Sequence, residues 1–358
     1  MTRYALCGGG TAGHITPLIA VAEELERVDP EARFVVVGTR GGREPELLPD
    51  HLDDMFVVPK LPFPRRIGRY ALTFPFRWIA AVVSSLVQLR SRGVDVVVGF
   101  GGYTAAPVYL AAWLAKIPLV IHEANALPGM ANTLGSKLTK NVAVCFPGTP
   151  LPRATAVGMP MRQSVRNVGA VSVAEARKHF GLKARTPVLL VTGGSTGAQS
   201  LNRTIEAVAS ECVAQGWQVL HLRGRDNDAP PSTPSDFVSL GYTDRMDLAL
   251  RAASLVVSRA GAATVSEIQL TGVPAVFVPY HVGNGEQEHN ARATVDANAA
   301  VMVANKDFTP QWVRNTLVPL MGDKKKLSEM ATSMAALGVS DAASQVALMA
   351  VRAAQKGS

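Results

Sequence analysis

The chain has 358 residues, enough for about two domains of ~150 residues each. Hydrophobic residues make up 47% and charged residues 18%, which excludes an intrinsically disordered chain, and only three separated cysteines occur, which excludes a disulfide framework and a structural zinc site. The 36 Lys and Arg against 28 Asp and Glu give a net charge of +8, which favours an anionic partner such as a phosphorylated ligand, a nucleic acid or an acidic lipid.

Short apolar runs alternate with helical patterns along the chain. The runs expected as strands are residues 4–7, 34–37, 94–98, 119–121, 188–191, 219–222, 255–257 and 275–278. Such alternation indicates buried parallel strands with helices on both faces. The sequence therefore predicts an α/β protein of two Rossmann-like, doubly wound lobes, with a boundary rich in Pro and Gly near residues 157–171 and a helix start at Ser172.

The sparse cysteines fit a reducing cytosol. The N-terminus has no apolar stretch long enough for a signal peptide. The longest charge-free stretch, residues 96–115, reaches the length of a membrane span, but Gly and Pro residues divide it into strand, turn and helix. We therefore expect no transmembrane helix.

A glycine-rich turn follows the first expected strand. Residues 8–13 fit the pattern G-x-G-x-x-G between a strand and a helix, so that backbone N–H groups could face a phosphate. No acidic residue follows the second strand, where NAD-binding proteins hold the ribose, although Arg40 would suit NADP. A tight turn that needs glycine without any ligand is the alternative. His14, next in the chain, is a candidate general base, or else caps the turn or binds a phosphate.

Two later segments of the first half point to the same sheet edge. Residues 99–104 form a second glycine-rich turn that could hold another anion, unless its glycines serve close backbone packing. Residues 122–125 follow the next strand and supply a titratable pair and the amide of Asn125. Glu123 could orient His14, bind a sugar hydroxyl or lie in a surface loop.

The second half repeats the device of a glycine-rich turn after a buried strand. Residues 193–199 open a helix with Ser195, Thr196 and several N–H donors. This arrangement suits an anionic leaving group such as a nucleotide diphosphate. Arg162, near the boundary between the halves, could add a mobile cation or be an ordinary surface arginine.

Residues 258–267 follow another strand of the second half. Thr264 to Glu267 match the capping-box pattern, in which the carboxylate bonds a backbone N–H at the helix start. A carboxylate in this first turn could equally accept both hydroxyls of a ribose, because nucleotides bind at this edge of such sheets.

A basic, aromatic segment lies between residues 55 and 94, which include no Asp or Glu but seven Lys or Arg. Basic residues interleaved with aromatic ones suit an anionic membrane surface, whereas RNA binding would lack a recognised module. The membrane candidates are Phe63, Arg65, Arg66, Arg69, Phe74 and Trp78. After Pro75 we expect a helix with Ile79, Val82, Val83 and Leu86 on a core-facing side.

Together these segments resemble the MurG-type family of peptidoglycan glycosyltransferases, and the resemblance covers essentially the whole chain. The resemblance rests on residues 8–14 with Thr16-Pro17, 101–107, 122–125, 158–162, 193–199, 261–267 and 287–291. The resemblance implies a GT-B fold, two Rossmann-like lobes that face each other across a cleft. It implies an acceptor- and membrane-associating domain of residues 1–162 with about 339–358, and a UDP-GlcNAc-binding domain of residues 163–338.

The family resemblance also implies an activity. It is the inverting transfer of N-acetylglucosamine from UDP-GlcNAc to the C4 hydroxyl of the muramyl sugar of lipid I, giving lipid II and UDP. His14 is the first choice for the general base and Glu123 the second. We expect no cofactor and no metal. The expected partners are UDP-GlcNAc, polyprenyl-linked lipid I, an anionic membrane surface and other cell-wall synthesis proteins, but no nucleic acid, and the expected location is peripheral, on the cytoplasmic face of the bacterial membrane.

The resemblance assigns roles position by position. Donor sugar and phosphates are contacted by Thr11, Ala12, Gly13 and Asn125 and the diphosphate by Arg162 and Ser195. The uracil lies near Thr243 and the nucleotide against Ala262, Ala263, Thr264, Val265 and Ser266, while Glu267 holds the ribose and Gln287 the GlcNAc hydroxyls. The acceptor phosphates are assigned to Gly10, Gly101, Gly102 and Tyr103.

Two other functions remain compatible with the residues. An NADP-dependent reductase would use residues 8–13 with Arg40 but leaves the second glycine loop and Glu267 unexplained. A nucleotide-sugar sensor docked on membranes would bind UDP-GlcNAc without turnover.

Overall fold

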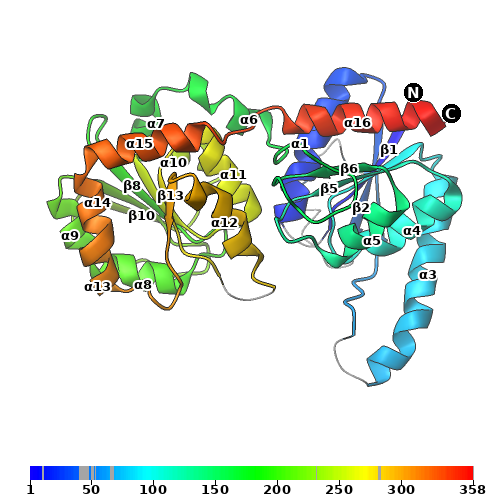
Figure 1. The fold of residues 1–358 in the computed structure, drawn as a ribbon, viewed down its shortest axis with the longest axis horizontal. Helices are drawn as coiled ribbons and strands as arrows, with labels where there is room; N and C mark the ends of the chain where they lie inside the picture. Colours follow the sequence, from blue (N-terminus) through cyan, green and yellow to red (C-terminus); the bar gives the residue numbers. More distant parts are fainter. Residues whose placement is uncertain are drawn as a thin grey trace. The chain divides into compact units, whose positions relative to one another are not determined.

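The computed structural model describes residues 1–9, 12–39, 48–49, 52, 54–64, 68–230, 232–280 and 284–357. The chain divides into two compact units, named here the N-terminal lobe (Met1–Gln163 with Ser340–Ser358) and the C-terminal lobe (Ser164–Val339). Each lobe is a parallel sheet with helices on its faces (Figure 1). The predicted α/β class with two Rossmann-like lobes is confirmed.

Within the described residues, the sheet of the N-terminal lobe has seven parallel strands in the order β3-β2-β1-β4-β5-β6-β7. The strands are β1 Arg3–Cys7, β2 Arg33–Thr39, β3 Met55–Val58, β4 Val96–Gly99, β5 Leu119–Glu123, β6 Asn141–Val144 and β7 Ala154–Ala156. The helices are α1 Ala12–Val28, α3 Arg69–Ser91, α4 Ala105–Ala115, α5 Met130–Leu138 and, from the end of the chain, α16 Ala342–Gly357.

Alternation along β1 explains why helices cover both faces of this sheet. Tyr4 and Leu6 belong to an apolar cluster that includes residues of α1 and α16, whereas Ala5 and Cys7 belong to a second cluster that includes residues of α3 and α4. A strand buried on both faces needs a continuous apolar run, which is the pattern visible in the sequence. The carboxyl ends of β1, β4 and β5 then lie at one sheet edge, where ligands bind in such folds.

Helix α3 differs from the expectation. It begins at Arg69, so Pro75 lies inside it, and it packs against α4. Ile79 and Val83, expected to face the core, are 57% and 52% exposed. The predicted core-facing side is therefore wrong for these two residues, whereas Val82 is buried and Leu86 packs against the core, as expected. The buried face consists of Ala81, Val82, Ser85 and Leu89.

The surface of α3 is unusually apolar for a helix at the edge of a lobe. Among the described residues, it is the one helix long and apolar enough to cross a membrane, and little of it is buried. Its first half extends away from the sheet, at the opposite end of the lobe from α16 (Figure 1).

The C-terminal lobe has a sheet of six parallel strands, counted over the part of the chain that the structure describes, in the order β10-β9-β8-β11-β12-β13. The strands are β8 Val188–Thr192, β9 Gln218–Leu222, β10 Phe237–Leu240, β11 Leu255–Ser258, β12 Ala275–Phe277 and β13 Ala300–Met302. The helices and helical turns are α6 Gln163–Arg166, η2 Val168–Ala170, α7 Val173–His179, α8 Gln199–Ala207, α9 Ala209–Ala214, α10 Met246–Ala252, α11 Ala262–Thr271, α12 Glu286–Asp296, α13 Pro310–Trp312, η3 Val313–Leu317, α14 Val318–Gly322 and α15 Lys324–Ala335.

The predicted helix start at Ser172 is confirmed. The Ser172 hydroxyl accepts from the Glu175 N–H at 3.1 Å, and the Glu175 carboxylate accepts from the Ser172 N–H at 3.0 Å. Two otherwise unsatisfied N–H groups are thereby paired, which fixes where α7 begins.

Candidate functional site

The first glycine turn joins β1 to α1 in the N-terminal lobe. Gly8 needs its missing side chain, because a Cβ there would lie 2.9 Å from the carbonyl oxygen of His14. Gly13 and His14 belong to the first turn of α1. Burial lowers the pKa of His14 below its ordinary value, so the imidazole is neutral at pH 7 and able to accept a proton. Of the predicted residues here, Gly10, Thr11 and the side chain of Ala12 lie outside the described residues.

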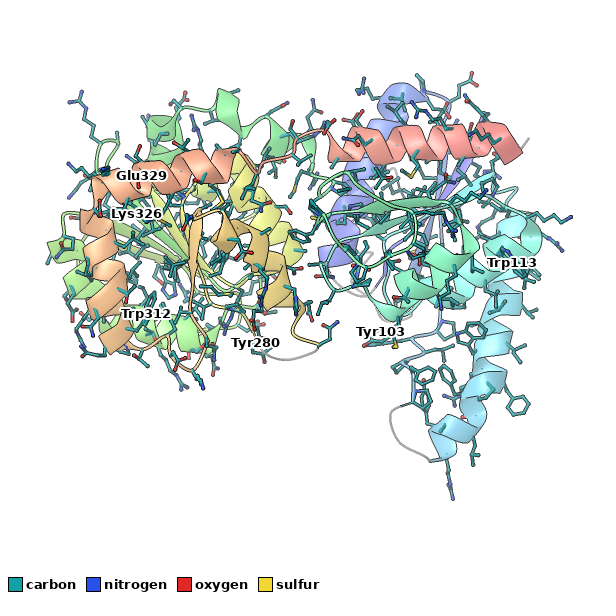
Figure 2. The ribbon with its side chains drawn as sticks, viewed as in Figure 1. Tyr103, Trp113, Tyr280, Trp312, Lys326 and Glu329 are labelled. Atoms are coloured by element: carbon teal, nitrogen blue, oxygen red, sulfur yellow. The ribbon has the colours of Figure 1, made fainter. Side chains whose placement is uncertain are left out.

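The second glycine turn, after β4, packs against the first. Gly102 has φ +91°, and a Cβ there would lie 2.6 Å from the carbonyl oxygen of Gly9. The N–H of Gly101 donates to the Tyr109 hydroxyl at 3.1 Å. The proposed phosphate contact through this N–H is therefore not available, and close packing explains these two glycines. Tyr103 is 51% exposed, with the Lys60 ammonium 5.9 Å from its ring centre (Figure 2).

Glu123, the second candidate for the base, is occupied by its own loop. Its Oε1 accepts from the N–H of Asn125 at 2.8 Å, and its Oε2 accepts from the N–H of Gly129 at 3.0 Å and from Asn132 Nδ2 at 2.9 Å. Only 3% of the residue is exposed, and burial raises the pKa of its carboxyl group while these donors lower it. Both oxygens thus shape the loop that carries Asn125, which makes Glu123 a positioning residue.

The remaining predicted residue of this lobe is Arg162. Its Nε lies 3.2 Å from Glu23 Oε1 of α1, and the N–H of Gln163 donates to the other oxygen of Glu23 at 3.3 Å. The guanidinium is about half exposed, so this pair contributes little stability and can separate at low cost.

A cavity of about 610 Å³ lies at the glycine turn of the C-terminal lobe. Its walls come from the turn after β8, the start of α8, and the segments that follow β11 and β12. Gln199 and Ser200 line the cavity from the first turn of α8, where helix N–H groups have no partner within the helix. This is the geometry in which a helix N-terminus binds an anion.

Ser195 belongs to this turn but is not among the residues that line the cavity, whereas Thr196 is. The Ser195 carbonyl accepts from the N–H of Arg225 at 3.2 Å, and the Thr196 carbonyl accepts from Asn227 Nδ2 at 3.0 Å. The glycine turn is therefore fixed from behind by the loop after β9. Gly197 is part of the same contact, because a Cβ there would lie 1.9 Å from the Arg223 carbonyl oxygen.

Arg259 lines the cavity and is not among the residues predicted from the sequence. Its Nη1 donates to the Val278 carbonyl at 2.9 Å and to Asn305 Oδ1 at 2.7 Å, and its Nη2 donates to Ser200 Oγ at 3.0 Å. Burial lowers the pKa of Arg259 somewhat, but an arginine keeps its charge. The pocket thus contains a fixed cation beside the helix N-terminus, directly after the end of β11, and this position is the signal that could have revealed it.

Tyr280 completes this side of the pocket. It is 48% exposed, and the guanidinium carbon of Arg259 lies 5.2 Å from its ring centre (Figure 2). The oxygen of Gln287 accepts from the N–H groups of Ala260 at 3.2 Å and of Tyr280 at 3.0 Å. Gln287 is thus held at the pocket wall by its oxygen.

Helix α11 supplies the predicted nucleotide segment. Its N-cap is Gly261, without a side-chain cap, so the capping-box interpretation of Glu267 is wrong. Thr264 lines the cavity, Ala263 is partly exposed, and the side chains of Ala262, Val265 and Ser266 are buried in the lobe. These three could therefore meet a nucleotide only through their backbone.

Glu267 is partly buried and strongly perturbed. The pKa of its carboxyl group is raised to about 7, mainly by burial and to a smaller extent by the nearby carboxylate of Asp247. Asp247 is itself held by Arg245 in a two-pronged pair, at 3.0 and 2.8 Å. Thr243 lies in the turn before this pair, where its hydroxyl accepts from the N–H of Arg245 at 3.0 Å.

The loop behind the glycine turn contains the spacing Asp226-Asn227-Asp228, which is an Asp-x-Asp pattern. Asn227 uses its side chain to hold Thr196, as described above. Over the part of the chain that the structure describes, no group of three or more His, Cys, Asp or Glu side chains is placed to hold a metal ion.

Two parallel-sheet lobes, the second with a helix N-terminus and a fixed arginine at a pocket, form the architecture of the GT-B glycosyltransferases. Residues 4–144 match the N-terminal domain of glycosyltransferase family 28, and residues 188–346 match its C-terminal domain. The chain belongs to glycosyltransferase family 28.

Relatives of known name agree with this family. The chain is 48% identical over 97% of its length to the UDP-N-acetylglucosamine--N-acetylmuramyl-(pentapeptide) pyrophosphoryl-undecaprenol N-acetylglucosamine transferase of Clavibacter sepedonicus, covering 95% of that protein. It is 48% identical over 97% of its length to the transferase of the same name from Leifsonia xyli subsp. xyli, covering 97% of it. The crystal structure of Acinetobacter baumannii MurG has a TM-score of 0.79 at 28% identity, over 98% of this chain and 100% of that one.

Proposed function

We propose that the protein transfers N-acetylglucosamine from UDP-GlcNAc to the C4 hydroxyl of the muramyl sugar of lipid I, releasing UDP and forming lipid II. The observation that carries this proposal is the pocket of the C-terminal lobe, where the first turn of α8 and Arg259 converge on a space of about 610 Å³ suited to a diphosphate. The names of relatives 48% identical over nearly the whole chain support the donor and the acceptor.

The proposed reaction is a single displacement with inversion. The acceptor hydroxyl attacks the anomeric carbon while His14 takes its proton, and the bond to UDP breaks on the opposite face. The charge that develops on the leaving diphosphate meets the N-terminus of α8, which is already oriented before the reaction. Glu267 would accept the ribose hydroxyls, and Arg162 is a proposed second cation for the diphosphate, which its separable pair with Glu23 permits.

Release of UDP tests this proposal. The purified protein is incubated with UDP-GlcNAc, with and without a polyprenyl-pyrophosphoryl-muramyl-peptide in detergent, at several magnesium concentrations and with chelator. UDP release only with the acceptor is expected. UDP-GlcNAc binding without release would instead support the nucleotide-sugar sensor, and binding of NADPH in a fluorescence titration would support the reductase.

The raised pKa of Glu267 predicts opposite pH dependences for folding and for UDP binding. Since this pKa is about 7 in the folded chain against 4.5 normally, the folded state retains a proton that the unfolded state loses, and stability falls as pH rises through this window. Ribose binding needs the carboxylate, so UDP affinity should rise as pH rises through about 7.

Glu267→Gln should therefore weaken UDP binding by about tenfold at pH 8 and flatten its pH dependence relative to the unchanged protein. The same change should raise the free energy of unfolding at pH 8 by at most about 3 kcal/mol, and the Tm should rise with it. Calorimetric UDP titrations at pH 6, 7 and 8 with thermal melts measure both, and the exposed Glu288→Gln is the control. Equal UDP affinity of Glu267→Gln and the unchanged protein at pH 8 would remove Glu267 from the ribose site.

We also propose that α3 attaches the protein to an anionic membrane. Leu72 and Phe76 are 73% and 75% exposed, and they continue along the helix into Ile79, Val83 and Val87 on one stripe. An exposed apolar stripe flanked by arginines is the pattern of a helix that lies in a membrane interface. The exposed cations and aromatic residue beside this stripe are Arg69, Arg77, Arg90 and Phe63, whereas the predicted Phe74 and Trp78 are partly buried and pack against the core of the lobe. The predicted Arg65 and Arg66 lie outside the described residues.

The double change Leu72→Ser with Phe76→Ser should weaken binding to phosphatidylglycerol vesicles by about tenfold or more. The reason is that two large apolar side chains are then no longer transferred from water into the membrane on binding. Vesicle co-sedimentation measures this, with activity on a detergent-dispersed acceptor expected to remain. Met130→Ser with Val339→Ser removes two other exposed apolar side chains and serves as the control. Equal loss in both variants would show that α3 has no special role.

Under this proposal, residues 1–162 with about 339–358 form the acceptor- and membrane-associating domain, and residues 163–338 bind UDP-GlcNAc. The exposed apolar stripe of α3 in the first and the diphosphate pocket in the second support this division. The protein would act peripherally, on the cytoplasmic face of the bacterial membrane, beside other proteins of cell-wall synthesis.

A further inference from the structure

A second cavity of about 610 Å³ lies in the N-terminal lobe, away from the sheet edge that carries the candidate site. It is lined by residues near the amino ends of β5 and β6, by the edge strand β7 and by one face of α16. Pro118, Val157 and Met349 provide apolar walls, and Leu348 is 40% exposed. This groove, called here the α16–β7 groove, is not part of the proposed reaction.

The α16–β7 groove has a one-sided charge. Arg352 and Lys356 line it, and neither forms an ion pair or hydrogen bond with another described residue. Residues 342–357 contain no Asp or Glu, and residues 116–158 contain only Glu123, which is buried elsewhere. The acid at the start of α16, Asp341, accepts from Gln345 at 2.9 Å and lies two turns or more before Arg352. The groove therefore favours an anionic occupant.

The backbone of β7 offers a second kind of contact. This strand ends the sheet, and no strand among the described residues pairs with its outer edge. The N–H of Val157 donates to the Val144 carbonyl at 3.0 Å, so the N–H of the preceding residue, Ala156, points to the outer edge. All three residues of β7 are exposed. Such an edge can add a further strand from another chain.

We propose that the α16–β7 groove binds an acidic, extended peptide segment of another protein, which adds as a strand to β7 and places its carboxylates against Arg352 and Lys356. A strand satisfies the free backbone groups of β7, and the side chains on the face toward α16, some acidic and some apolar, reach the two cations and the apolar walls. A membrane surface would satisfy only the charge. The exposed stripe of α3 reaches toward the opposite end of the lobe (Figure 1).

A fluorescent eight-residue peptide is the probe, in which every second residue is by turns valine and glutamate, so that both types lie on one face of the strand, with threonine at the positions between. By fluorescence anisotropy we expect saturable binding to the full chain, with a Kd below about 100 µM at moderate salt. Arg352→Glu with Lys356→Glu should weaken it by about tenfold or more. Ala156→Pro, which removes the outward N–H and leaves the ladder bonds, should weaken it as well. The control is Lys324→Glu with Lys326→Glu on α15, an equal charge change on an exposed helix (Figure 2).

Thermal melts and UDP release check that each variant folds, and both should stay unchanged in the two charge-reversal variants. The same peptide with N-methylated alternate amides should bind weakly. The proposal is overturned by absence of saturable binding, by equal loss in the α15 control, or by equal binding of the N-methylated peptide. It is also overturned if phosphatidylglycerol vesicles, and not the peptide, lose binding on reversal of Arg352 and Lys356.

Discussion

Gly197→Ala is expected to lower the affinity for UDP by about 100-fold or more, because two costs act together at this position. Gly197 has φ +76°, a conformation that L-residues other than glycine rarely adopt, and a Cβ there would lie 1.9 Å from the Arg223 carbonyl oxygen. Neither atom is a flexible side-chain end, so the glycine turn must move away from the loop after β9. That movement displaces the N–H groups at the start of α8.

Gly216→Ala separates clash from strain. Gly216 also has φ +76°, but a Cβ there meets nothing within 4 Å, and the residue lies before β9, outside the pocket lining. The Gly216→Ala variant should lose about 1 kcal/mol of folding stability and bind UDP with unchanged affinity. Calorimetric UDP titration and thermal melts of both variants measure the two effects. If Gly197→Ala binds UDP as Gly216→Ala does, the contact with Arg223 does not shape the diphosphate site.

The sequence was sufficient for β1, β2, β4, β5, β8, β9, β11 and β12, because continuous apolar runs mark them. It did not reveal β3, β6, β7, β10 and β13, although β3, Met55–Val58, is itself a short apolar run. The clearest case is β7, whose three residues, Ala154–Ala156, are all exposed and have no apolar period to detect. Pairing with β6, and not composition, makes this segment a strand.

The same distinction applies to the site. Motif positions predicted that the turns carrying Gly9 and Gly102 would lie together, and the structure places them in contact. Motifs did not show that both carboxylate oxygens of Glu123 would accept hydrogen bonds from its own loop. Nor did they show that Arg259 would be held by hydrogen bonds to Asn305 and Ser200. The donors to Glu123 lie 2 to 9 residues away in the segment that follows β5, and the partners of Arg259 lie 46 and 59 residues away, so no motif spacing encodes these contacts.

His14→Ala is expected to lower kcat by about 10²- to 10⁴-fold while leaving UDP affinity unchanged, because removal of a general base affects only the step in which the proton moves. Initial rates of UDP release at saturating acceptor, with UDP titrations, measure the two quantities. His179→Ala changes an exposed histidine on α7 and should alter neither. Unchanged kcat in His14→Ala would exclude His14 as the base.

The pH profile distinguishes a base from a residue that only binds or shapes the turn. Burial lowers the pKa of His14 below 6.5, so the neutral imidazole persists as pH falls to that value, and kcat should decline only below it. The pKa of Glu267, about 7, should instead lower kcat/KM for UDP-GlcNAc at a higher pH, since it governs donor binding by the free protein. Two acid limbs at different pH values are therefore expected in the unchanged protein. In Glu267→Gln the limb in kcat/KM should move down toward that of His14. A single limb common to both parameters, unaffected by this substitution, would contradict the assignment of separate roles to the two groups.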